Sequence, residues 1–207
     1  MIYTIGKLGV QLLLDACGYE LEQIARPIRQ FSLLFADHLK RINDFRVSVV
    51  KGAAEQGYTL ETWHDERYFR SATDYVTWED SKGHEHTKPI LPDGYFCLLV
   101  PTKGRTHCFL EIDRNYQPHP IYRQKIAVYE AYLASGQYQQ RFSKTSMRVL
   151  IVTSGERRLQ HLLQTTEKSG GDEKYWFTTF PQVTPKNILT APIWRMLGED
   201  ELKPLID

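Results

Sequence analysis

The sequence predicts an α/β fold in which a mixed sheet is flanked by helices. Apolar residues recur at three- and four-residue steps through residues 31–53, but at two-residue steps from Tyr58 onward, so a helical segment precedes strands. Residues 147–171 then form a continuous apolar run followed by a helical pattern, which is typical of a buried parallel strand and its crossover helix. This order of elements favours a sheet covered by helices on its faces.

The N-terminal third is predicted to be mainly helical. Residues 2–14, IYTIGKLGVQLLL, suggest a short strand, a glycine-containing turn and an apolar helix. The apolar period of residues 31–53 predicts one long amphipathic helix, or two helices joined near Asn43, stopped by Gly57. This stripe would pack against the sheet, or alternatively form a homodimer interface.

The middle of the chain is predicted to form strands. Residues 58–70 and 74–90 have a two-residue period, and a Ser-Lys-Gly turn joins two strands within the second segment. Two apolar runs then flank Lys103-Gly104 within residues 91–113, LPDGYFCLLVPTKGRTHCFLEID, and predict a hairpin.

The remaining elements alternate between helix and strand. Residues 120–138 predict a helix with proline near its start and glycine at its end. After the strand and helix of residues 147–171, residues 174–180 predict one more strand. The proline-punctuated tail, residues 183–197, is expected to be irregular, with Trp194 covering apolar surface.

Length and composition restrict the class of protein. The 207 residues suffice for one domain, with or without a small appendage. No apolar run approaches the roughly 18 to 20 residues that cross a membrane, so we expect no membrane partner. Lys7 and Asp15 argue against a secretory signal, and the three cysteines form no CxxC pair, so we expect a reducing, cytoplasmic location.

The charge balance leaves nucleic acid open as a partner. The net charge of +1 argues against a uniform polyanion-binding surface, although basic residues can still gather locally. Lys40 and Arg41, and likewise Arg157 and Arg158, are candidate contacts to a DNA backbone. The alternative is that they lie on ordinary solvated helix faces.

Three acids stand at the ends of the predicted hairpin strands. Strand pairing would bring Asp93 opposite the end of the second strand, and alternation would place Glu111 and Asp113 on one face. Converging carboxylates repel one another unless a cation neutralises them, and the natural occupant is Mg²⁺ or Mn²⁺. The alternative is a Pro-Asp-Gly turn beside a solvated strand end.

The next predicted helix adds a cation and a hydroxyl. Lys125 and Tyr129 are four residues apart and share one helical face, which a right-handed crossover would bring over the sheet. Lysine could stabilise negative charge on a phosphate, and tyrosine could position a phosphate or water. Both could instead only pack against the core. Upstream, Glu66 could add an outer metal ligand.

The order of Asp93, then Glu111-Ile-Asp113, then Lys125-x-x-x-Tyr129 resembles the PD-(D/E)XK nuclease superfamily. The wider sequence resembles one branch, the replication-relaxation family of plasmids and integrative elements. The segments that carry this likeness, nearly the whole chain, are YTIGKLGVQLL, FADHLKRINDFRVSVVKGAAEQG, TWHDERYFR, LPDGYF, CFLEIDRN, KIAVYEAY, RVLIVTSGERR and PIW.

The resemblance implies a DNA-acting protein of mobile-element replication. Residues 1–27 would be the remnant of a winged-helix-like segment, and residues 28–207 a nuclease-like domain. The implied metal ligands are Asp93, Glu111, Asp113 and Glu66, with Lys125 and Tyr129 completing the catalytic set. The superfamily usually has a lysine where Asp113 stands. The resemblance therefore implies either that Lys125 replaces it from the helix, or that the domain is a non-catalytic module for DNA binding or assembly with a replication protein.

Other polar groups favour structural roles. His107 and Cys108 are adjacent in a strand and should point to opposite faces, which argues against a thiol nucleophile with its base. The Ser-Gly before Arg157 is expected to cap a helix, and His84 and His86 are expected at a solvated hairpin tip.

Overall fold

A computed structural model describes residue 11 and residues 33–80, 82–101, 103–113 and 119–206. The chain divides into two units, residues 1–40 and 41–207, and apart from the first residues of helix α2 the description below concerns the second. The winged-helix-like segment expected at residues 1–27 lies outside the described residues, except for Gln11. Within the described ranges, no helix has both the length and the apolar character needed to cross a bilayer.

The long N-terminal stripe is one helix rather than two. Helix α2 runs without interruption to Gln56 and ends at Gly57, whose φ of 70° lies in the left-handed region that favours glycine. In the described residues, the α-helices α2 to α6 cover Leu33–Gln56, Glu66–Ser71, His119–Ala134, Gln137–Phe142 and Glu156–Lys168, in that order. A short 3₁₀ turn, η2, covers Phe180–Gln182.

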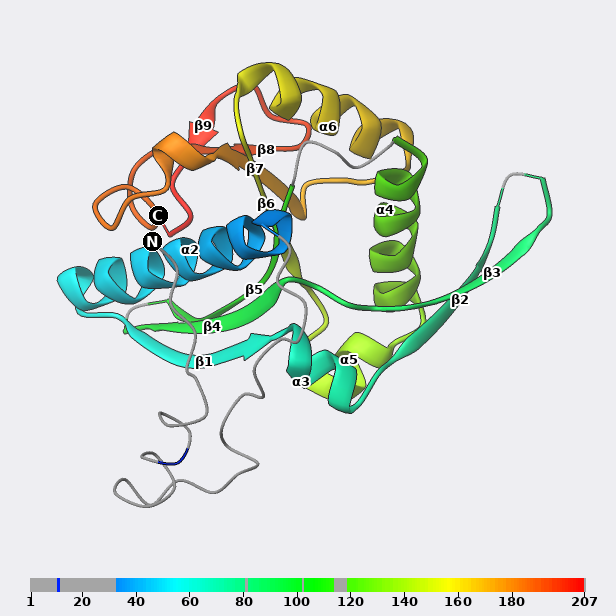
Figure 1. Ribbon diagram of the computed structural model, residues 1–207, viewed down its shortest axis with the longest axis horizontal. Coiled ribbons are helices and arrows are strands. Elements are labelled where there is room, and N and C mark those ends of the chain that lie inside the picture. Colours follow the sequence, from blue (N-terminus) through cyan, green and yellow to red (C-terminus); the bar gives the residue numbers. More distant parts are fainter. Residues whose placement is uncertain (1–10, 12–32, 81, 102, 114–118, 207) are drawn as a thin grey trace. The chain divides into compact units, whose positions relative to one another are not determined.

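The sheet is mixed, as predicted. Seven strands follow the order β1-β4-β5-β6-β7-β8-β9, in which β5, β6 and β7 are parallel and the other neighbours are antiparallel. The strands are β1 (Thr59–Asp65), β4 (Gly94–Val100), β5 (Gly104–Ile112), β6 (Arg148–Thr153), β7 (Tyr175–Thr179), β8 (Trp194–Met196) and β9 (Leu202–Lys203). The sheet therefore begins with the antiparallel strands β1, β4 and β5 and continues with the parallel strands β6 and β7, which are reached through α4 and α6 (Figure 1).

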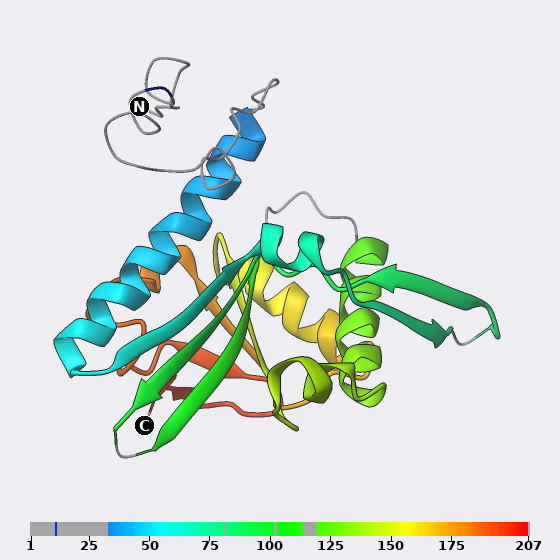
Figure 2. The same cartoon turned by 90° about the horizontal axis from the view of Figure 1, so that it is seen from below.

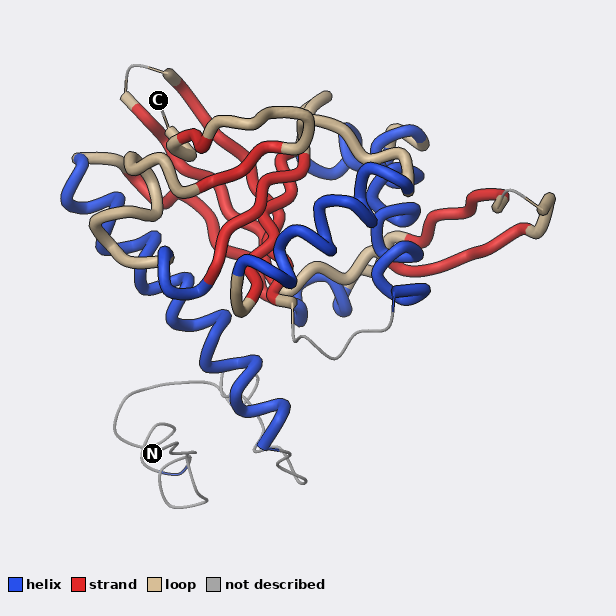
Figure 3. The backbone as a smooth tube through the Cα atoms, turned by 90° about the horizontal axis from the view of Figure 1, so that it is seen from above, coloured by secondary structure: helices blue, strands red, loops and turns tan. Residues whose placement is uncertain are grey.

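Helices cover both faces of this sheet. One apolar cluster joins β5, β6 and β7 to α4 and α6 through residues such as Phe109, Ile126 and Leu159. The other cluster joins the opposite face to Phe45 and Val49 of α2 and to the C-terminal segment. Figure 2 shows α4 and α6 on the other side of the strands from α2, and Figure 3 shows the strands running between helices.

A two-stranded arm leaves the sheet between β1 and β4. Strands β2 (Tyr75–Glu79) and β3 (Glu85–Pro89) pair only with each other and project away from the main sheet (Figures 1 and 2). The two ends of the arm meet where Ile90 N donates to Asp74 O at 3.0 Å. Its tip carries the expected turn, since Asp80 accepts from the backbone N of Lys82 and of His84.

Three local predictions were wrong. Residues 66–71 form helix α3 instead of extending a strand, because the Asp65 carboxylate caps the backbone N of Arg67 and of Tyr68. The helix predicted for residues 120–138 ends at Ala134, and a second helix, α5, begins after Gly136. The tail contributes strands β8 and β9, and Trp194 is indeed buried there, with Nε1 donating to Ile188 O.

Candidate functional site

The β4–β5 hairpin brings Asp93 to the end of β5. Gly94 pairs with Leu110 in the antiparallel register, so the residue before β4 lies beside the last residues of β5. Asp93 N donates to Leu110 O at 3.1 Å, and Asp93 Oδ2 accepts from Ile112 N at 2.7 Å. The predicted juxtaposition of Asp93 with the Glu111 segment is therefore present, and two backbone contacts fix it.

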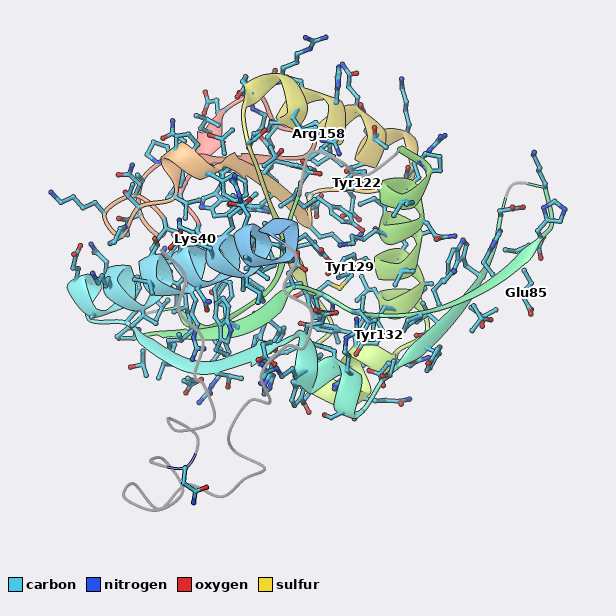
Figure 4. The ribbon with its side chains drawn as sticks, viewed as in Figure 1. Lys40, Glu85, Tyr122, Tyr129, Tyr132 and Arg158 are labelled. Carbon is cyan, nitrogen blue, oxygen red and sulfur yellow. The ribbon has the colours of Figure 1, made fainter. Side chains whose placement is uncertain are left out.

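Glu111 is the acid around which the helix residues gather. Its side chain faces α4, and the residue is only 4% exposed. Tyr129 Oη donates to Oε1 at 2.5 Å, and Lys125 Nζ donates to Oε2. Lys125 and Tyr129 thus share the face of α4 that the four-residue spacing predicts, and Figure 4 shows Tyr129 pointing from α4 toward the sheet.

Burial decides the proton affinity of Glu111. Desolvation raises the pKa of its carboxyl from 4.5 to about 7, although the Lys125 ammonium acts in the opposite direction; the nearby Asp93 charge raises the pKa further. Burial and the Glu111 charge also raise the pKa of Tyr129, so its hydroxyl remains a donor. A carboxyl that titrates near neutrality therefore lies between an acid, an ammonium and a phenol.

Asp113 lies on the same face of the strand end but has different partners. Arg158 donates through Nε to Oδ2 at 3.0 Å and through Nη2 to Oδ1 at 2.9 Å. Thr153 Oγ1 donates to Oδ2 at 2.7 Å. The carboxylate that was expected to bind a metal or orient water is instead bound to the first turn of α6.

Glu66 is likewise engaged outside the expected cluster. It begins α3, directly after Asp65, which pairs with Gly94 in the β1–β4 register. Its carboxylate accepts from Nε of Arg70 at 2.9 Å, one turn along the helix, and this bond is exposed. In the described part of the chain, no group of three histidine, cysteine, aspartate or glutamate side chains is arranged to hold a metal ion. The acids thus form an Asp93 and Glu111 pair instead of a cluster of three or four.

The basic residues proposed as DNA contacts differ in their surroundings. Lys40 is exposed on α2, whereas the Arg41 guanidinium lies 4.1 Å above the centre of the Phe180 ring. On α6, Arg157 is exposed, whereas Arg158 is bound to Asp113. These two arginines line an open cavity of about 480 Å³ together with Ser154, Gly155, Glu156 and His161, so an acid also borders it.

The neighbouring thiol and imidazole have structural surroundings. His107 and Cys108 do point to opposite faces, since Cys108 belongs to the core cluster on the α2 side. His107 instead faces Tyr95 and Cys97, with Nδ1 at 2.6 Å from Tyr95 Oη and Nε2 at 3.7 Å from Cys97 Sγ. Burial raises the pKa of the Cys97 thiol to about 11, so it stays protonated near neutrality.

The partners of Asp113 were missed at the level of sequence. Both Thr153 and Arg158 lie around the turn between β6 and α6, and β6 is parallel to β5. The sequence signal that could have revealed them is the apolar strand of residues 148–153 followed at once by a helix. If that strand is parallel to β5, the carboxyl ends of both strands lie at the same edge of the sheet. A basic residue in the first turn of that helix can then reach an acid at the end of the neighbouring strand.

Comparison with known proteins supplies one match. A family model described as Replication-relaxation matches residues 1–147. Neither the curated proteins nor the solved structures include a match. The family description suggests a role in plasmid or mobile-element replication. Because the matched residues make up more than half of the 207, the chain belongs to the replication-relaxation family.

Proposed function

We propose that this protein acts on DNA during plasmid or mobile-element replication, through a nuclease-like site built on Asp93, Glu111 and Lys125. The observation that carries the proposal is that the Asp93 and Glu111 carboxyl groups, at adjoining strand ends, lie near enough for their charges to interact, next to a lysine from the following helix. The order α2, β1, β4, β5, α4 and β6, with an antiparallel meander followed by a parallel strand, supports a PD-(D/E)XK-type core.

The donor set fits a hard divalent cation. Mg²⁺ is commonly held by one or two carboxylates with waters completing the shell, and Asp93 and Glu111 provide two. Desolvation raises the pKa of Glu111 to about 7 despite Lys125, so an additional positive charge there would favour the ionised carboxylate. Glu111 would have to release only the single Lys125 ammonium, whereas Asp113 would have to give up two bonds from Arg158 and one from Thr153. Glu66 is paired with Arg70 on its own helix, so we assign the ion to Asp93 and Glu111.

Each residue then has a distinct task. Bound Mg²⁺ or Mn²⁺ would supply Lewis-acid polarisation of a phosphodiester oxygen. Lys125 would leave Glu111 and place its ammonium near the negative charge that develops on the phosphate. Tyr129 is buried and would keep Glu111 oriented, while Arg158 would hold Asp113 and the start of α6 in place.

A second candidate function is a non-catalytic module for DNA binding or assembly. It is favoured by a specific observation: Lys125 contacts Glu111 and Arg158 contacts Asp113, so the chain can neutralise these acids by itself. In that case the exposed residues Lys40 and Arg157 would contribute to DNA or partner binding without cleavage. The two candidates differ in whether an ion is required.

Metal titration separates the two candidates. Calorimetry with Mn²⁺ should give binding heat for the native protein that Asp93→Ala and Glu111→Ala abolish. Glu85→Ala, which removes an exposed carboxylate from the arm, should leave that heat unchanged. Lys125→Met should still bind Mn²⁺, since a competitor for Glu111 is gone, but should lose cleavage of plasmid DNA.

The contrary outcome is equally informative. Native protein without measurable Mn²⁺ binding would overturn the nuclease proposal. Retention on duplex DNA that weakens steeply with salt would then support the DNA-binding module. An absent or salt-independent interaction with DNA would point to a protein partner.

A further inference from the structure

A small pocket opens beside Glu111, between the base of the arm and α4. Its volume is about 210 Å³. The lining residues come from the end of β3 and the segment after it, from β5, where Glu111 lies, and from α4, which contributes Lys125 and Tyr129. The pocket therefore shares three residues with the candidate site and extends away from it over apolar surface.

The pocket has apolar walls and a polar floor. The walls are Pro89, Ile90, Leu91, Ile121 and Val128. The floor is the hydrogen-bonded group of Glu111, Lys125 and Tyr129. Ile121 stands out because it is apolar and yet 51% exposed, on the first turn of α4 beside this hollow. Apolar walls with a few polar groups at one end are typical of small-ligand sites.

The size and charge of the pocket limit what it can receive. About 210 Å³ is below the roughly 300 to 1,000 Å³ of pockets for drug-sized ligands, so one small ring system fits better than a helix or a duplex edge. Lys88 is exposed on the arm side and Lys125 lies at the floor, so cations border an apolar hollow. A flat apolar group joined to a phosphate matches that combination.

We propose that this pocket receives one unpaired base of the DNA strand whose phosphate lies at Asp93 and Glu111. The inference rests on the proposed function in that it takes DNA as the ligand. The base would pack against the aliphatic walls and Pro89, its polar edge would meet Gln124 or Glu111, and Lys88 would contact the adjoining phosphate. Extruded bases are held elsewhere by the same combination of apolar packing and edge hydrogen bonds.

The consequence is a preference for unpaired DNA. A base inside a duplex must be unstacked and unpaired before it can enter a pocket, and that cost is least where the base is already unpaired. Single strands, or duplexes with one bulged nucleotide, should therefore bind at least about tenfold more tightly than a paired duplex of the same sequence.

Binding can be measured without cleavage by supplying Ca²⁺, which also binds carboxylate oxygens, in place of Mg²⁺ or Mn²⁺. Four fluorescent DNA ligands of one sequence are compared: a single strand, a paired duplex, a duplex with one bulged nucleotide, and the same bulge carrying an abasic site. The abasic bulge keeps the flexibility and the phosphate but lacks the base. The native protein should prefer the base-containing bulge over the abasic bulge by about tenfold. Equal affinity for these two bulges would overturn the proposal.

Two variants and one control locate the preference. Ile121→Ala removes a wall and Val128→Phe fills the pocket, and each should reduce the preference for the base-containing bulge several-fold while leaving duplex affinity unchanged. Val50→Ala is the matched control, because Val50 is an aliphatic side chain, 45% exposed, on α2. Circular dichroism checks that each variant is folded. A preference that survives in folded Ile121→Ala and folded Val128→Phe would contradict the assignment.

The outcome is separable from that of the nuclease proposal. Loss of Mn²⁺ binding or cleavage, with the preference for the base retained, would overturn the nuclease reaction and leave the base pocket standing. Conversely, cleavage of DNA by a protein that binds the two bulges equally well would overturn the base pocket and leave the nuclease reaction standing.

Discussion

Glu111 and Asp113 lie two residues apart on one face of the β5 end, and they have opposite characters. Both are nearly inaccessible, at 4% and 6% exposure, and each meets a cation from a different helix. Arg158 contacts both oxygens of Asp113, and Thr153 adds a third bond. Glu111 is held by the Lys125 ammonium and the Tyr129 hydroxyl, and it lies near Asp93.

The difference shows how similar acids acquire different tasks. A guanidinium presents a planar fork that matches a carboxylate, whereas an ammonium is a point charge on a flexible stem. Asp113 with Arg158 is therefore a fixed connection between β5 and α6. Glu111 instead borders an open pocket and titrates near neutrality, so its partner and its charge can both change.

The largest expected effect on stability comes from removing the ion pair between Asp113 and Arg158. Arg158→Met should leave Asp113 buried without its cation and reduce the free energy of unfolding by roughly 3 to 5 kcal/mol. Urea denaturation measures the loss. Adding Asp113→Asn should restore part of it, because a buried amide costs less than an unpaired carboxylate. If Arg158→Met costs no more than Lys125→Met, the contrast between the two acids fails.

A pH series tests the titrating side. The folded-state pKa of Glu111, about 7, exceeds its ordinary value of 4.5, so the folded protein binds more protons between these values. Glu111 therefore contributes most to stability below pH 4.5, and this contribution is lost as the pH rises through 7. The loss is on the order of 3 kcal/mol.

Substitution identifies the source of that slope. Glu111→Gln should flatten the dependence of the unfolding free energy on pH between 4.5 and 7. Glu85→Gln, on the exposed arm, should leave it intact. A slope that persists in Glu111→Gln would assign the titration to another group.

The smallest expected effect on stability comes from removing one tyrosine hydroxyl from α4. Tyr129→Phe removes the donor to Glu111, and the expected cost is about 1 to 2 kcal/mol at pH 7 and greater at higher pH, because a bond to a charged acceptor is stronger. It should also raise the pKa of Glu111 further.

Tyr122→Phe is the matched control, since Tyr122 Oη meets the neutral Thr166 Oγ1 at 2.9 Å. Its cost, about 1 kcal/mol, should not vary with pH. Equal pH dependence in both variants would argue against a charged Glu111.

Periodic patterns predicted the parts of the fold that depend on local spacing. The two-residue alternation and the Lys103-Gly104 turn gave the β4–β5 hairpin, and with it the position of Asp93 beside the end of β5. The four-residue spacing predicted that Lys125 and Tyr129 share one face of a helix over the sheet, and in the structure that face meets Glu111. These features follow from backbone geometry alone, so one sequence is enough to predict them.

Contacts between residues far apart in the sequence could not be predicted from local periodicity. Asp113 and Arg158 are separated by 45 positions, and only the parallel pairing of β5 with β6 brings α6 to the acid. Strand β8 has three residues and follows a proline, so it lacks the length for a recognisable period. Helix α3 depends on one capping carboxylate, Asp65, in a segment whose apolar pattern also fits a strand.

The two ends of the β2–β3 arm are hydrogen-bonded to each other, so the pairing of the main-sheet strands does not depend on the arm. Strands β1 and β4 are hydrogen-bonded neighbours, and the chain leaves and returns at Asp74 and Ile90. The base is anchored, because Val76 and Ile90 belong to the core. The arm's tip could therefore carry a lengthened loop or a reporter peptide without altering the strand register that holds Asp93 against β5.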